Sequence, residues 1–128
     1  MMAVRLSLVA ISVLAIAWLA VLLRDQEVGQ AAYARIRHSG AHAPAELARD
    51  LGRLKEAQFL NPDSRWKLYR GSFLLYRNPR EGNRVLEALA RSEPDNIEAW
   101  SGLLLGTRGA ERRRAVTEIK RLDPLARP

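Results

Sequence analysis

Residues 6–23 read LSLVAISVLAIAWLAVLL, a run of about 18 residues that contains no charged side chain. A helix of this length can cross the hydrocarbon core of a bilayer. The run also has no polar face, which a helix in the core of a soluble domain normally shows. We therefore predict a transmembrane segment at residues 1–24, followed by a polar domain at residues 25–128.

We expect this segment to remain attached as a signal anchor. Ala15-Ile16-Ala17 offers the small residues of a cleavage site, but Trp18 and five more apolar residues follow, so cleavage would leave an apolar stub. A short tail containing Arg5 precedes the run, and such tails usually stay inside the cell. This predicts a single-pass membrane protein whose C-terminal domain lies outside the cytoplasm, in the periplasm. Arg24 argues for the opposite orientation.

The chain has 128 residues, a formal net charge of +7 and no cysteine. The lack of cysteine excludes disulfides, thiolate metal sites and a cysteine nucleophile. The basic charge has two interpretations: the arginine-rich codon usage of a GC-rich genome, or attraction to phospholipid headgroups or nucleic acid. Because acidic residues are interspersed along the chain, we favour the first.

Turn and capping residues divide the polar domain into six short helices. The first continues from the apolar run to His38, and the second runs from Pro44 to Asn61-Pro62. The next four begin near Ser64, Asn78, Asp95 and Gly109. No alternating pattern predicts a strand. The predicted fold class is all-α, with one N-terminal transmembrane helix followed by stacked antiparallel helical hairpins.

The helix ends repeat along the chain. Pro62, Pro94 and Pro124 are spaced by 32 and 30 residues, and Trp66 and Trp100 are 34 residues apart. A period near 34 residues, with one helix pair in each unit, is typical of tetratricopeptide repeats. Residues 45–124 thus resemble a degenerate tetratricopeptide repeat protein of about two to three units. The resemblance implies that the first helix of each pair lines a concave groove, and it implies no particular ligand.

The match to this family is incomplete. Gly82 fits the small residue that opens the second helix of a pair, whereas Leu104 stands where a small residue is expected. Further departures are Asp50, Leu89, Arg112 and Ile119. Because such repeats need about three units for stability, we expect a partner, a second copy of the chain or the membrane to complete the stack.

Basic and aromatic residues alternate between residues 65 and 84, and three interpretations are open. The aromatic side chains can belong to the core, they can grip an extended peptide while arginines bind its carboxylates, or they can stack on single-stranded nucleic acid. We favour the core for part of this set and the peptide groove as its functional alternative. The candidate partner-binding residues are Trp66, Tyr69, Arg70, Phe73, Arg77 and Trp100.

The sequence shows no pattern that predicts catalysis. His38 and His42 are four residues apart, but Gly40 lies between them and no cysteine joins them, so we expect neither a metal site nor a cofactor. Phosphate-binding loops and nucleophile motifs are also missing. We therefore expect a protein that is not an enzyme.

These observations favour a membrane-anchored helical-repeat adaptor, bacterial in style, that binds a protein or peptide partner during the assembly of an envelope complex. The alternative is a structural accessory subunit held in a membrane complex by its transmembrane helix, since Ala10, Ser12, Ala15 and Ala17 permit close helix packing. Membrane lipid and a second copy of the chain are further expected partners, and nucleic acid is not.

Overall fold

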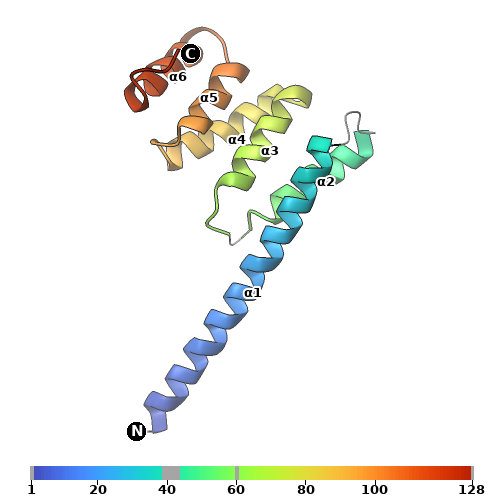
Figure 1. The fold of residues 1–128 in the computed structure, drawn as a ribbon, viewed down its shortest axis with the longest axis vertical. Coiled ribbons are helices and arrows are strands. Elements are labelled where there is room, and N and C mark those ends of the chain that lie inside the picture. The colour runs from blue at the N-terminus through green and yellow to red at the C-terminus, as the bar shows by residue number, and fades with distance from the viewer. Residues whose placement is uncertain (1, 39–43, 60, 128) are drawn as a thin grey trace.

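The computed structural model describes residues 2–38, 44–59 and 61–127, which form six α-helices and no strand. The helices are α1 (Met2–His38), α2 (Pro44–Glu56), α3 (Arg65–Arg77), α4 (Pro79–Ser92), α5 (Ile97–Gly106) and α6 (Gly109–Leu122). Figure 1 shows α1 as one long rod, with α2 beside its C-terminal half and α3 to α6 stacked to one side. The predictions of an all-α chain and of one long apolar N-terminal helix are confirmed.

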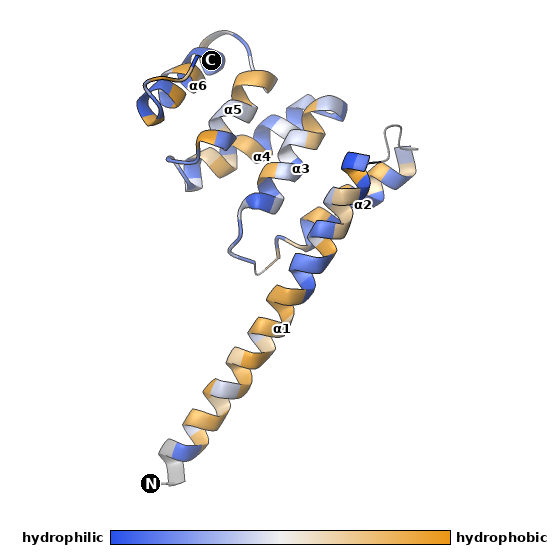
Figure 2. Ribbon diagram, viewed as in Figure 1, coloured by the Kyte–Doolittle hydropathy of each residue, from blue (hydrophilic) through white to orange (hydrophobic). Residues whose placement is uncertain are grey.

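Helix α1 continues without a break across the predicted boundary at residues 24 and 25. Residues 5–20 are all exposed, Val21 and Leu22 are partly covered, and Ala32 is fully buried. Figure 2 shows the same change as hydropathy, because apolar residues surround the N-terminal half of α1 whereas polar and apolar residues mix in its C-terminal half. The first half of α1 thus projects from the domain, and the second half belongs to it.

Asn78 begins α4 as predicted. Its side-chain Oδ1 accepts a hydrogen bond from the Glu81 backbone N–H at 3.4 Å, and Pro79 occupies the first turn. The Glu81 carboxylate accepts from the Asn78 side-chain amide at 3.3 Å. It does not bind the Asn78 backbone N–H, because that group already donates to the Leu74 carbonyl at 2.7 Å.

The predicted cap of α5 is wrong by one residue. Asn96 caps this helix, and its side-chain Oδ1 accepts from the Ala99 backbone N–H at 3.1 Å. Asp95 stands one position too early for this bond, and its carboxylate instead accepts from Arg121 at 3.1 Å. Asn96 therefore caps α5, whereas Asp95 joins the α4–α5 turn to the end of α6.

Two apolar clusters form the core. The first, which we call the N-terminal cluster, joins α1, α2 and α3 through Ala32, Leu51, Leu54, Ala57, Trp66 and Leu74. The second, the C-terminal cluster, joins α3 to α6 through Leu68, Leu86, Leu89, Ala90, Ala99, Trp100, Leu103, Ala115 and Ile119. Helix α3 contributes to both clusters and connects α1 and α2 to the rest of the domain.

Each helix packs on its neighbour in the sequence. The most extensive contacts are those of α3 with α4 and of α5 with α6, followed by α1 with α2 and α4 with α5. Helix α3 also contacts α5. An ion pair between the Arg35 guanidinium and the Asp50 carboxylate, at 2.9 Å, ties α1 to α2. The domain is therefore a row of packed helices of which the C-terminal half of α1 is the first.

Candidate partner-binding surfaces

The largest exposed apolar surface of the described chain is the N-terminal half of α1. Leu6, Ile11, Leu14 and Leu19 are each more than half exposed, and Trp18 is 43% exposed. This helix is long and apolar enough to cross a membrane, and its most apolar window has no buried residue within the protein. Since exposed apolar area of this extent is unfavourable in water, a bilayer or other apolar surroundings must cover it.

The predicted aromatic residues of α3 lie against α1. Tyr69 stacks on Tyr33 of α1 with ring centroids 4.3 Å apart, and Phe73 tilts against the same ring at 5.9 Å. Trp66 meets Tyr69 edge-on at 6.0 Å and is only 3% exposed. The contacts of Tyr69 and Phe73 with Tyr33 join α3 to α1. Trp66 lies in the core, whereas Tyr69 and Phe73 remain partly exposed.

Arg70 and Arg77 lie together on the neighbouring face of α3, toward α2 and α4. They line an open depression of about 470 Å³ where α3 lies between α2 and α4, which we call the basic hollow. Its lining is Ala48, Leu51, Gly52, Lys55, Arg70, Leu74, Arg77, Asn78 and Glu81. The volume falls in the range of small-ligand sites, and the apolar floor with a charged rim suits one or two side chains of a bound segment.

The charges on the rim of the basic hollow are unevenly satisfied. Arg70 donates to the Glu81 carboxylate at 2.6 Å, and its own side chain is 15% exposed. Within the described ranges, Lys55 and Arg77 form no ion pair, and both are exposed. Two positive charges therefore remain at the rim to attract an anionic group.

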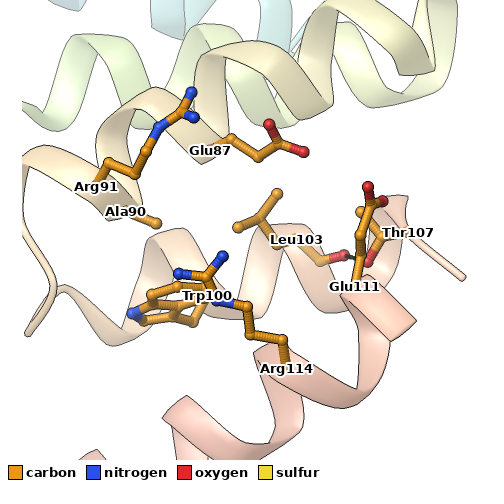
Figure 3. A pocket seen from close by; sticks show the side chains of 8 residues that line it. All are labelled: Glu87, Ala90, Arg91, Trp100, Leu103, Thr107, Glu111 and Arg114. Carbon is orange, nitrogen blue, oxygen red and sulfur yellow. Dashed lines mark hydrogen bonds between the residues drawn. The ribbon is translucent and has the colours of Figure 1, made fainter. Parts of the chain in front are cut away.

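Trp100 lines a second, smaller hollow of about 190 Å³, where α5 lies between α4 and α6. Figure 3 shows Glu87 and Arg91 on the α4 side and Glu111 and Arg114 on the α6 side, with Trp100 between them. The Arg114 guanidinium lies 5.5 Å from the indole centroid, and the indole N–H donates to the Pro94 carbonyl at 2.9 Å. The ring is thus held on two sides, and the space above it fits one small side chain.

The two hollows are alike in that each lies where one helix is flanked by two others, α3 by α2 and α4, and α5 by α4 and α6. The sequence predicts six candidate residues for one partner-binding surface, whereas the structure divides them among the α1 contact, the basic hollow and the Trp100 hollow. Lys55 was missed, and its position one helical turn from Leu51 on an otherwise apolar stripe is the signal that could have identified it.

No metal centre is evident in the described part of the chain, where no group of three His, Asp or Glu side chains is placed to hold an ion. The His38 Nδ1 lies 2.8 Å from the Ala34 carbonyl, one turn earlier in α1. His42, the other member of the predicted pair, lies outside the described residues.

The comparisons with known proteins found no matching family model, no matching curated protein and no matching solved structure.

Proposed function

We propose that this chain is a membrane-anchored helical-repeat adaptor that binds an acidic segment of a partner protein in the basic hollow. The observation that carries the proposal is the continuity of α1, which is exposed and apolar in its first half and packed into the domain in its second. A partner bound by such a domain is held at a fixed distance from the bilayer. A flexible linker would not impose this distance.

Helix pairing supports the tetratricopeptide-like part of the proposal. Helices α1 and α2, α3 and α4, and α5 and α6 are in contact, as three helix pairs would be. Tyr33 of α1 stacks on Tyr69 of α3, and α3 contacts α5, as the first helices of successive pairs would. Such stacks leave surfaces between units that bind extended segments. On this view the C-terminal half of α1, the helix that also forms the membrane anchor, is the first helix of the N-terminal unit.

The chemistry of the basic hollow favours a carboxylate-bearing partner. Arg77 and Lys55 supply positive charge without a described ion-pair partner, and Leu51 and Leu74 supply an apolar floor. Arginine binds carboxylates through paired hydrogen bonds, which gives direction as well as affinity. An apolar residue flanked by aspartate or glutamate is therefore the sequence that we expect in the bound segment.

Photo-crosslinking from the full-length chain in its native membranes tests this function. A benzophenone amino acid replaces Ala48, an exposed residue in the lining of the basic hollow, in one variant and Arg113, an exposed residue of α6, in a matched control. We expect a discrete protein adduct from position 48, none from position 113, and loss of the adduct when Lys55→Glu is added. Adducts of equal yield from both positions would refute the proposed site.

The structural-subunit alternative rests on the exposed face of α1, where small residues and Trp18 permit packing against another membrane helix. Exchanging residues 5–23 for an unrelated transmembrane segment separates the two functions. An adaptor keeps its adduct from position 48 after the exchange. A structural subunit no longer assembles into its complex after the exchange. In the parent chain, its adducts arise from a benzophenone placed within α1, for example at Leu14.

We propose that the anchor places the domain in the periplasm. The chain has no cysteine, so Arg108→Cys introduces the single thiol, at an exposed site. Labelling of intact cells by a membrane-impermeant thiol reagent is the expected result. Protection that ends on lysis would place the domain in the cytoplasm.

A further inference from the structure

We propose that the domain makes a second contact with the bilayer, through Phe59 at the end of α2, at the level where the lipid headgroups meet the acyl chains. The inference rests on the proposed membrane anchor, and it concerns the position of the domain relative to the membrane. Phe59 is 73% exposed in the structure, although it is a large apolar side chain.

Helix α2 runs antiparallel to α1, and this sets the level of its end. Arg35 of α1 pairs with Asp50 of α2 at 2.9 Å. Six residues further along α2, Glu56 lines a shared depression with Glu27 and Val28 of α1. Each further residue of α2 is thus level with a residue about one position earlier in α1, nearer to the apolar half of α1.

The chain keeps this direction beyond the end of α2. The Ala57, Gln58 and Phe59 backbone N–H groups donate to the carbonyls of Arg53, Lys55 and Glu56, at 2.9, 3.3 and 2.9 Å. Three residues in a helical path advance about 5 Å, which carries Phe59 from the level of Glu27 and Val28 to that of residues 24 and 25 of α1.

That level is the end of the apolar run, whose last residue is Leu23. The exposed fraction of α1 falls at Val21 and Leu22, and Figure 1 shows the connection from α2 to α3 as the part of the domain that lies nearest to the N-terminal half of α1. If residues 6–23 fill the hydrocarbon core, Phe59 lies at its boundary, one to two residues, or about 1.5–3 Å, beyond the level of Leu23 along the helix axis.

The charges around Phe59 fit this location. Arg24 follows the apolar run, is exposed and has no ion pair among the described residues, so it can reach an anionic headgroup. Asp25, the carboxylate at the same level of α1, is buried, and Glu27 and Glu56 line a depression further from the apolar run. An aromatic ring at the membrane boundary with a basic residue beside it is a common arrangement for interfacial anchoring.

The chain offers a direct test, because it has only two phenylalanines, Phe59 and Phe73. The full-length protein is produced with para-fluorophenylalanine and reconstituted in phosphatidylcholine vesicles that contain some phosphatidylglycerol. Fluorine NMR then compares the broadening caused by a spin label on the lipid chain near the headgroup with that caused by a water-soluble gadolinium chelate. Phe73, which packs on Tyr33 in the domain, is the internal control, and a Phe73→Leu sample assigns the two signals.

We expect the lipid spin label to broaden the Phe59 signal several-fold more than the Phe73 signal, and the water-soluble chelate to leave Phe59 largely unaffected. A Phe59 signal that is broadened by the chelate and unaffected by the lipid label would overturn the inference. Flotation of the same vesicles tests the anchor separately. A chain that floats while Phe59 remains in water refutes only this contact, and a chain that does not float refutes the anchor and the contact together.

Discussion

Replacing Gly82 with alanine should destabilise the domain, because α3 and α4 approach each other there backbone to backbone. A Cβ at position 82 would lie 2.7 Å from the Leu75 backbone nitrogen and 3.0 Å from the Gly71 carbonyl oxygen. Backbone atoms cannot rotate away as a side chain can, so the two helices would have to separate. Separation would loosen Leu86, which is fully buried and packs in the same contact.

The magnitude follows from two opposing effects. Overpacking in a core costs about 1–3 kcal/mol, and we expect the upper end because the obstructing atoms belong to the backbone. Alanine is favoured over glycine within a helix by about 1 kcal/mol, which offsets part of this cost. The net loss in the free energy of unfolding is therefore about 2 kcal/mol, or a fall of about 10 °C in Tm for a domain of this size.

Gly52→Ala is the matched control. Gly52 lies within α2, and a Cβ there would meet nothing within 4 Å. Only the helix-propensity effect remains, so we expect a gain of up to about 1 kcal/mol. The assay is urea denaturation of the full chain in detergent micelles, followed by the fluorescence of the buried Trp66 and Trp100, with Trp18→Phe to remove the signal of the anchor. The reasoning is refuted if Gly82→Ala is as stable as the parent, or if both alanine variants lose the same free energy.

Three further predictions concern local contacts. Gly29→Ala would place a Cβ 2.7 Å from the Trp66 ring, and should cost about 1–3 kcal/mol and increase hydrogen exchange where α1 meets α3. Asn78→Ala removes the cap of α4 and should lower the free energy of unfolding by about 1 kcal/mol in thermal melts, with Asn78→Asp retaining most of it. A hydrogen bond from the Arg65 side chain lowers the pKa of Asp63 from its ordinary value of 3.8, so this pair stabilises the fold above that pH and the contribution is lost as pH falls through the lowered pKa. In acid denaturation curves the parent and the Asp63→Asn variant should therefore converge as pH falls. At neutral pH their free energies of unfolding should differ by less than about 1 kcal/mol, because the pair is largely at the surface.

The helix ends could be predicted from the sequence because the signals that set them are local. Pro79 can only begin a helix at its first turn, and the residue before a proline is driven out of the helical region, so the bounds of α4 follow from a few neighbouring residues. The cap of α5 was misplaced because Asp95 and Asn96 are both good capping residues, and neighbouring capping residues do not show which of them adopts the extended backbone at the start of the helix. In the structure Asn96 does so, and Asp95 pairs with Arg121 of α6.

The candidate site was predicted less well, since it depends on which face of α3 meets which neighbour. Arg70 and Phe73 are three residues apart and looked like members of one surface, yet Phe73 faces Tyr33 of α1 and Arg70 faces Glu81 of α4. A helix with apolar residues on more than one side can be turned in either direction by its neighbours. The periodicity of a single helix does not contain this information, because the neighbour on each side is specified elsewhere in the chain.

The joint between α1 and α3 shows why the position of the domain relative to the apolar half of α1 is the hardest feature to predict. It depends on the close approach of Gly29 to Trp66, and the Trp66 indole nitrogen is buried there without a hydrogen-bond partner in the protein. An unpaired buried donor costs about 1–3 kcal/mol, which the apolar and ring contacts around Trp66 and Tyr33 must outweigh. No sequence pattern predicts whether these contacts outweigh that cost, because the residues that make them lie far apart in the chain. The same balance decides whether the domain stays fixed to the anchor, so the proposed role of holding a partner at a set distance depends on this joint more than on the repeats themselves.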